Sequence, residues 1–179
     1  MEEIKFFETI KCDDFEVFNL EYHNKRVANT IGLNIDLQEY IYPISGELLR
    51  CKVIYDENEI LDVQYFPYKK REIKSFKIIN CDEIDYSKKY LNRESLDNLF
   101  EKKEDCDEVI IVKNGIITDT SIANIAIFYE AQWLTSKECL LKGTTRARLL
   151  EEKRIIEKNI NLDMLKNASQ IALMNAMIG

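Results

Sequence analysis

The spacing of apolar residues changes several times along this chain of 179 residues, and each change predicts a new element of secondary structure. Two short apolar-rich runs, 6–12 and 15–19, are separated by two acidic residues and predict a β-hairpin. Apolar residues then recur at helical spacing over 20–33, where Gly32 is a typical helix stop. A second, short helix is predicted over 37–41.

From residue 48 onward the pattern changes to alternation of apolar and polar residues. Alternation of this kind is typical of strands that bury one face. It predicts strands over 48–55, 60–65 and 73–79, joined by short turns into an antiparallel sheet. The chain up to about residue 80 is therefore expected to form an α+β lobe.

The second half of the chain mixes short strands with helices. In chain order we expect a helix over 92–103, a strand over 108–112, a tight turn at 113–115, strands over 116–128 and 132–134, a helix over 145–153, a strand over 155–158, a helix over 162–168 and a buried strand over 171–174. The irregular, polar stretch 81–89 separates the halves. We therefore predict two domains, an N-terminal α+β lobe at 1–82 and a C-terminal lobe at 83–179.

Composition places the chain among globular proteins, with 46% hydrophobic and 32% charged residues. The net charge of −7 argues against non-specific binding to DNA or RNA. No apolar run approaches transmembrane length, and the N-terminus is acidic where a signal peptide would be basic. We expect a cytoplasmic protein with neither a nucleic-acid nor a membrane partner.

Several kinds of site are disfavoured by the residues that the chain lacks. Its five cysteines are widely spaced and form no C-x-x-C motif, so a zinc site and a disulfide framework are both unexpected. His23 is the single histidine, and no G-x-S-x-G motif accompanies it. With five glycines, the chain has neither a G-x-G-x-x-G motif nor a Walker loop.

The sharpest local signal is the segment Lys142-Gly143-Thr144-Thr145-Arg146, which opens a predicted helix. The first N–H groups of a helix have no partner within the helix, and the helix dipole adds positive potential there. A glycine followed by two hydroxyl residues at such a place suits a phosphate group. An ordinary N-terminal cap is the alternative explanation, because threonine caps many helices.

Six segments occur in the order found in one enzyme family. They are Phe7-Glu8-Thr9-Ile10, His23-x-x-Arg26, Lys89-Tyr90-Leu91-Asn92-Arg93, Thr118-Asp119-x-x-x-x-Asn124-Ile125, Gly143-Thr144-Thr145-Arg146 and an apolar strand closing on Asn175. Over essentially its whole length the chain resembles the fold-type IV pyridoxal-phosphate enzymes, which include branched-chain and D-amino-acid aminotransferases and aminodeoxychorismate lyase. The K-x-L-N-R and G-T-x-R segments make it most similar to the lyase.

The resemblance implies a fold and a catalytic residue. The fold would be α+β and two-lobed, like D-amino-acid aminotransferase, with a small antiparallel N-terminal lobe and a β-rich, pseudo-barrel C-terminal lobe with helices. Lys89 would form the Schiff base with pyridoxal 5'-phosphate, since that chemistry needs a flexible primary amine. Its neighbour Lys88 is the competitor, but Lys89 stands three residues before Asn92, as the family lysine does.

The resemblance also assigns the cofactor-binding residues. Asp119 would lie against the pyridine nitrogen, where the family usually has a longer glutamate. Arg26 would bind the cofactor phosphate with its guanidinium fork. Thr144 and Thr145 would add N–H groups and a hydroxyl at the helix start, and the backbone of Asn175 and Ala176 would complete the cradle.

A basic pair is the candidate for substrate recognition. Arg50 and Lys52 lie two residues apart and so face the same side of a predicted strand. In the lyase-like proteins a basic pair occurs near this place, which implies binding of a substrate carboxylate. The alternative of equal weight is the solvent face of an antiparallel sheet. His23 is expected to be structural.

Three functions follow from these observations. The leading hypothesis is a lyase that converts 4-amino-4-deoxychorismate to 4-aminobenzoate and pyruvate. The second is a class IV aminotransferase acting on branched-chain or D-amino acids. The third is a non-catalytic module that binds a chorismate-processing synthase, suggested by the short chain and by Asp119 in place of glutamate. The expected partners are a small-molecule substrate, a second copy in a homodimer and such a synthase, with no metal.

Overall fold

A computed structural model describes residues 2–179 of the chain. The chain divides into two compact units, and each takes two segments of the sequence. Unit 1 comprises the chain up to Lys70 together with Lys88–Asn92, and unit 2 comprises Arg71–Ser87 together with Arg93–Gly179. The domain boundary expected after residue 82 falls within the first segment of unit 2 and stays a prediction.

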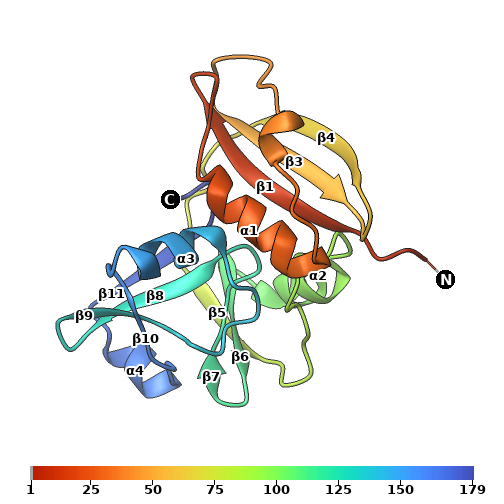
Figure 1. Ribbon diagram of the computed structural model, residues 1–179. Coiled ribbons are helices and arrows are strands. Elements are labelled where there is room, and N and C mark those ends of the chain that lie inside the picture. Colours follow the sequence, from red (N-terminus) through yellow and green to blue (C-terminus); the bar gives the residue numbers. More distant parts are fainter. Residues whose placement is uncertain (1) are drawn as a thin grey trace. The chain divides into compact units, whose positions relative to one another are not determined.

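Unit 1 is one antiparallel sheet with a helix on one face (Figure 1). Its elements are β1 (Phe6–Asp13), β2 (Glu16–Val17), the helix α1 (Leu20–Ile31), the 3-10 helix η1 (Leu37–Glu39), β3 (Leu49–Tyr55) and β4 (Ile60–Pro67), with strand order β2-β1-β3-β4. The predicted hairpin, the helix and the first two alternating strands, β3 and β4, are confirmed. The helix stops at Gly32, whose φ of 75° permits its N–H to bond the carbonyl of Ala28.

Alternation along β3 explains how this sheet buries one face. Leu49, Cys51, Val53 and Tyr55 are buried, whereas the residues between them are partly exposed. The buried residues form a core with Ile10, Cys12 and Phe6 of β1 and with Val27 of α1. We call this side of the sheet the helix face. The opposite side carries Phe7, Thr9, Arg50 and Lys52.

Unit 2 contains two further sheets and most of the helices. The first sheet has the order β5 (Phe76–Asn80), β6 (Glu108–Lys113), β7 (Ile116–Ile117), and the second the order β10 (Ile156–Glu157), β9 (Gln132–Thr135), β8 (Asn124–Tyr129), β11 (Gln170–Met174). The helices are α2 (Glu94–Phe100), η2 (Glu101–Lys103), α3 (Thr144–Glu151) and α4 (Leu162–Asn167). No helix within residues 2–179 combines the length and the apolar character needed to cross a membrane.

Three expectations about strands were wrong. The strand predicted over 73–79 was assigned to the first antiparallel sheet, but β5 belongs to unit 2 and pairs parallel with β6. A parallel pair needs a long crossover, which here contains α2. The strand predicted over 116–128 is interrupted after Ile117 by the turn that contains Asp119. The last strand, β11, was expected to be buried, but Ile171 is 42% exposed.

Strand β8 lies at the centre of the second sheet and separates two helices. Ile125 and Ile127 pack into the core that includes Leu165 of α4. Ala126 points to the other face, where it packs with Met174 and with Leu149 and Leu150 of α3. This alternation places α3 and α4 on opposite faces of the sheet (Figure 1), and it fixes where the first residues of α3 meet the start of β8.

Candidate active site

The carboxyl group of Asp119 is buried in unit 2 and is held by three donors. Oδ1 accepts from the backbone N–H of Leu140 at 2.8 Å. Oδ2 accepts from the N–H of Leu141 at 3.3 Å and from Nδ2 of Asn124 at 3.1 Å. Burial raises the pKa of Asp119 to about 7, although the bonds from Leu140 and Leu141 and the charge of Arg146 lower it. The group is therefore poised between its charged and neutral forms near neutral pH.

The side chain of Asn124 uses both ends of its amide to join three parts of unit 2. Nδ2 donates to Asp119 and, at 2.7 Å, to the carbonyl of Leu141. Oδ1 accepts from the N–H of Gly143 at 3.1 Å. Asn124 thus connects the Asp119 carboxyl group directly to the residue that caps α3. It reaches both because it is the first residue of β8, directly after the interrupting turn.

Gly143 is required by this contact rather than by its backbone conformation. Its φ of −70° and ψ of 154° are open to any residue. A β carbon at this position would lie 2.2 Å from Oδ1 of Asn124. The two atoms would overlap, so no residue with a side chain fits here without a shift. The glycine is therefore needed for the close approach of the loop to the Asn124 amide.

The N-terminus of α3 carries the residues expected to hold a phosphate. Thr144 and Thr145 are buried, and their N–H groups have no hydrogen-bond acceptor among residues 2–179. No side chain caps this end of the helix. The hydroxyl of Thr145 donates to the carbonyl of Asn175 at 2.9 Å, which places Asn175 and the adjoining Ala176 beside the helix start. An anion would satisfy the unpaired N–H groups.

Asn175 closes the loop beneath this helix. Its Oδ1 accepts from the N–H groups of Met177 and Ile178 at 3.0 and 2.8 Å, and its Nδ2 donates to the carbonyl of Ile122 at 3.2 Å. Unit 2 therefore brings together all five of the residues predicted there, namely Asp119, Thr144, Thr145, Asn175 and Ala176.

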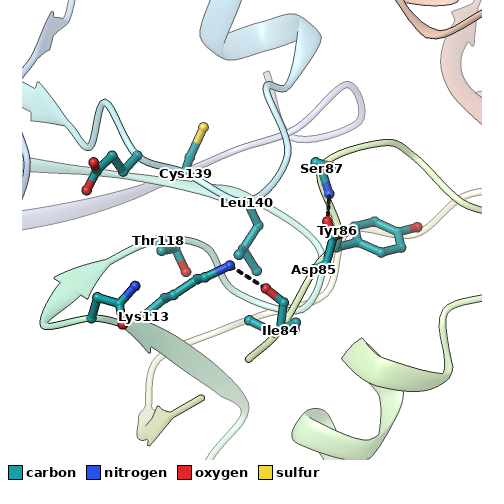
Figure 2. A pocket seen from close by; sticks show the side chains of 10 residues that line it. Ile84, Asp85, Tyr86, Ser87, Lys113, Thr118, Cys139 and Leu140 are labelled. Atoms are coloured by element: carbon teal, nitrogen blue, oxygen red, sulfur yellow. Dashed lines mark hydrogen bonds between the residues drawn. The ribbon is translucent and has the colours of Figure 1, made fainter. Parts of the chain in front are cut away.

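A cavity of about 290 Å³ is lined by residues that include Ile84, Lys113, Thr118 and Leu140 (Figure 2). Thr118, which precedes Asp119, and Leu140, which donates to it, are both part of its wall. Two bonds within the cavity hold the segment that leads to Lys88, since Lys113 donates to the Ile84 carbonyl at 2.7 Å and Asp85 accepts from the Ser87 N–H at 3.0 Å. The charged side chains of Lys113 and Asp85 therefore hold the backbone of residues 84–87 in place.

Lys89 lies beside β1 in unit 1. Its carbonyl accepts from the N–H of Phe7 at 3.0 Å, and Phe6 and Tyr90 form an isolated β-bridge. Neighbouring residues of such a bridged segment point to opposite sides. Nζ of Lys89 lies 4.4 Å from the centre of the Phe7 ring, whereas Lys88 lies over Phe6 and donates to the carbonyl of Thr30 at 3.1 Å.

Arg26 is engaged by a buried glutamate on the helix face. Its Nε and Nη2 atoms donate to the two carboxylate oxygens of Glu8 at 2.8 and 2.5 Å, and Nδ1 of His23 lies 2.6 Å from Oε2. Burial alone would raise the pKa of Glu8, but the Arg26 charge and the bonds from His23 and Arg26 lower it to about 2. Burial lowers the pKa of His23, so its ring is a neutral donor to Glu8.

Arg50 and Lys52 lie on the same side of the sheet, opposite the helix face, as expected. The Arg50 guanidinium lies 4.9 Å from the centre of the Phe66 ring, and Nζ of Lys52 lies 5.2 Å from that of Phe7. Because Lys89 lies over the same Phe7 ring, unit 1 gathers Lys52 and Lys89 around one aromatic side chain.

Two residues with clear positioning roles were not assigned from the sequence. Asn124 was only part of a motif, although its spacing of five from Asp119 was the available signal. Glu8 was also part of a motif. Its signal was a charged residue at an inward position of a strand, between Phe6 and Ile10, which predicts a buried ion pair.

The residues present fit pyridoxal phosphate. The unpaired N–H groups of Thr144 and Thr145 suit its phosphate, and the close approach at Gly143 leaves the helix start free of a capping side chain. Asp119 supplies a buried carboxyl group whose pKa burial raises to about 7, and Lys89 supplies a primary amine.

The fold is that of the fold-type IV pyridoxal-phosphate enzymes, as the resemblance implied. The chain matches a structure of a candidate 4-amino-4-deoxychorismate lyase from Haemophilus somnus with a TM-score of 0.91 and 35% identity, over 100% of this chain and 99% of that one. The branched-chain amino acid aminotransferase of Escherichia coli matches with a TM-score of 0.73 and 15% identity, over 98% of this chain and 74% of that one, which shows the fold alone.

Sequence similarity places the chain in a family. Residues 85–179 match the model of the amino-transferase class IV family. An uncharacterized protein of Haemophilus influenzae is 36% identical over 89% of this chain and 84% of its own length. The chain belongs to the class IV aminotransferase family, whose members are pyridoxal-phosphate-dependent lyases or aminotransferases that act on small molecules and are typically dimers.

Replacing Glu8 by glutamine should destabilise the protein. The Arg26 guanidinium would keep its charge and lose its counter-ion, which costs about 3–5 kcal/mol at buried pairs. Chemical denaturation measures the change in the free energy of unfolding. Glu16→Gln, at an exposed position of β2, is the control and should change it by less than about 0.5 kcal/mol. Equal effects of the two substitutions would contradict the structural role of Glu8.

The contact between Gly143 and Asn124 can be tested by a double-mutant cycle. Gly143→Ala should cost about 1–3 kcal/mol of stability, because its β carbon would overlap Oδ1 of Asn124. In an Asn124→Ala background the obstructing atom is gone, and the same substitution should cost less than about 1 kcal/mol. Equal costs in both backgrounds would show that the amide is not what excludes a side chain.

Titration of Asp119 should appear in the pH dependence of stability without cofactor. Because its pKa of about 7 in the folded protein lies above its ordinary value of 3.8, the folded state holds the proton more tightly. The free energy of unfolding should therefore fall from pH 4 to 7 by about 1.4 kcal/mol per pH unit from this group alone. Asp119→Asn should lack this slope, whereas Asp105→Asn, at an exposed position, should retain it.

Proposed function

We propose that the protein is a pyridoxal-phosphate-dependent 4-amino-4-deoxychorismate lyase. The observation that carries the proposal is its similarity, over the whole of both chains, to the Haemophilus somnus protein that bears this name as a candidate. A Schizosaccharomyces pombe relative with a comparable name is 28% identical over 98% of this chain and 87% of its own length. The products would be 4-aminobenzoate and pyruvate.

The resemblance assigns cofactor-binding roles to residues of unit 1 and, separately, to residues of unit 2. Lys89 would bond its aldehyde carbon, Asp119 would face its ring nitrogen, and Thr144 and Thr145 would bind its phosphate with support from the backbone at Asn175 and Ala176. Arg26 would add its guanidinium to the phosphate site. Because Glu8 already binds Nε and Nη2 of Arg26, it would fix the direction of that guanidinium.

When bound, pyridoxal phosphate supplies an electron sink for the negative charge that develops at the substrate's α carbon. The protein must then move protons and hold the acid groups in place. Lys89 would remove the α proton and return a proton to the departing enolpyruvyl fragment, acting as base and then acid. Arg50 and Lys52 would bind substrate carboxylate. Asp119 would favour a protonated ring nitrogen.

Lys89 is a better candidate than Lys88 on structural grounds. Lys88 donates a hydrogen bond to the carbonyl of Thr30 and lies over Phe6, on the helix face. Lys89 lies over Phe7, on the side that carries Arg50 and Lys52. A lysine on the same side of the sheet as the proposed carboxylate-binding residues can reach a substrate that they hold.

Asp119 in place of the usual glutamate is compatible with this role. The carboxylate has room for about four hydrogen bonds and accepts three from Leu140, Leu141 and Asn124. One acceptor position therefore remains for a ring N–H. The protonated ring would in turn lower the pKa of Asp119, since an opposite charge favours the carboxylate.

A class IV aminotransferase is the second candidate. A hypothetical aminotransferase of Mycobacterium tuberculosis bound to alpha-ketoglutarate and PMP has the same fold, with a TM-score of 0.81 at 17% identity over 97% of this chain and 78% of that one. A non-catalytic module bound to a chorismate-processing synthase is the third candidate, since protein groups already occupy donors of Arg26 and acceptor positions of Asp119. A homodimer and a cytoplasmic location belong to the leading proposal.

Pyruvate release from 4-amino-4-deoxychorismate tests the lyase directly. With pyridoxal phosphate added, the wild type should release pyruvate, Lys89→Ala should lose at least about a thousandfold in kcat, and Lys88→Ala should keep most of it. Borohydride should fix the cofactor on Lys89. Transfer of an amino group to 2-oxoglutarate from branched-chain or D-amino acids, with no pyruvate formed, would favour the second candidate. Protein that takes up no cofactor would favour the third.

A further inference from the structure

A buried arginine lies in the first turn of α3. Arg146 belongs to the start of this helix and is only 3% exposed. A cation at the start of a helix opposes the helix dipole, and taking its charge out of water costs further free energy. The contacts of its guanidinium must offset both costs.

Within residues 2–179 the guanidinium pairs with a single carboxylate, which is partly exposed to solvent. Nη2 of Arg146 donates to Oε1 of Glu157 in β10 at 2.7 Å and to the carbonyl of Ser136 at 3.0 Å. The Glu157 side chain is 38% exposed, so water screens its charge more than that of Arg146. Nε of Arg146 is buried without a hydrogen-bond partner among the same residues. The pair therefore leaves part of the positive field of Arg146 inside unit 2.

This field reaches the carboxyl group of Asp119. Asn124 donates to Asp119 and accepts from the N–H of Gly143. A β carbon built on Gly143 would lie 4.0 Å from the β carbon of Arg146, so the arginine side chain begins beside the same contact. Burial raises the pKa of Asp119, and the charge of Arg146 is among the effects that lower it.

Two other titratable side chains lie near this cluster. Burial and the charge of Asp119 raise the pKa of Cys139 to about 11, so its thiol is neutral at neutral pH. Lys142 acts on the same thiol, but it is exposed, and its charge is screened by water. Arg146 is thus the buried cation that acts on both Asp119 and Cys139.

We propose that Arg146 is a positioning residue that keeps the Asp119 carboxyl group charged for its role at the cofactor's ring nitrogen, and that Glu157 limits how strongly it does so. A charged carboxylate favours a protonated ring nitrogen, and a protonated ring is the better electron sink. The support matters here because Asp119 is shorter than the glutamate usual at this position. This rests on the proposed function, which assigns the ring nitrogen to Asp119.

A purely structural role for Arg146 is the alternative, because its two bonds join α3 to Ser136 and to β10. The two roles depend on different properties of the side chain. A structural link needs the guanidinium fork, whereas an electrostatic effect on Asp119 needs the positive charge. Lysine keeps the charge and lacks the fork, so lysine and glutamine at this position separate the two roles.

The pKa of Asp119 in the cofactor-free protein tests the proposal. Carbon-13 NMR of labelled aspartate side chains measures it, and the signal of Asp119 is the one absent from the spectrum of Asp119→Asn. Arg146→Gln should raise this pKa by about one unit, because it removes an opposite charge, and Arg146→Lys should leave it within about 0.3 of the wild-type value. Glu157→Gln should lower it by about 0.5–1, because it removes the counter-ion of Arg146.

Glu152→Gln is the matched control. Glu152 is 41% exposed and pairs with Arg148 of the same helix at 3.2 Å, and its loss should leave the pKa of Asp119 unchanged. If Arg146→Gln does not fold, Glu157→Gln decides the question alone. The proposal is overturned if Glu157→Gln moves the pKa of Asp119 no more than Glu152→Gln does. It is also overturned if Arg146→Lys raises this pKa as much as Arg146→Gln.

The role of Arg146 and the lyase can fail separately. A pKa of Asp119 that responds as expected, together with no pyruvate release by the wild type, would reject the lyase and keep the electrostatic effect of Arg146. Pyruvate release by the wild type, together with a pKa of Asp119 that none of these substitutions moves, would keep the lyase and reject the role of Arg146.

Discussion

The amide of Asn124 is the contact on which the candidate site in unit 2 depends. It donates to Asp119 and to the carbonyl of Leu141, and it accepts from Gly143. An amide can donate from one end and accept at the other, at fixed positions on a short stem. Removing either end would leave a buried polar group without its partner, which costs about 1–3 kcal/mol. The position of the carboxyl group and the start of α3 are therefore set by one residue.

Two buried carboxyl groups in this chain show opposite electrostatic behaviour. Glu8 has a pKa near 2 because the Arg26 charge and the bonds from His23 and Arg26 outweigh its burial. Asp119 has a pKa near 7 because its donors are neutral N–H groups, which do not offset burial fully. A buried carboxylate with a cationic partner is a structural element, whereas one with neutral donors can still change its charge. This contrast suits Asp119 to a cofactor and Glu8 to holding Arg26.

The parts of the fold that the sequence predicted well are those set by local pattern. The alternation of β3 and the helical spacing ended by Gly32 each identified an element, because burial of one face dictates both patterns. The pairing of β5 was missed because a strand's own residues do not record which sheet it joins. That choice follows from α2, which returns the chain for a parallel partner in unit 2.

The same limit applies to the site. The motifs pointed to Asp119, Thr144 and Thr145, which unit 2 holds together, because in the proposed role these residues contact the cofactor themselves. Asn124 and Glu8 act through other residues, so their importance appears only once their bonds are known.

Strand β1 shows why residues next to each other in sequence can have separate roles. Its inward residues Phe6 and Glu8 belong to the helix face, where Glu8 fixes Arg26. Phe7 and Lys11 belong to the other side, where Phe7 lies beneath the ammonium groups of Lys52 and Lys89. Because the backbone of Lys89 is bonded to that of Phe7, any shift of β1 would move the lysine and Glu8 together. The strand therefore couples the lysine proposed to carry out the chemistry to Glu8, which positions the arginine proposed to bind the phosphate.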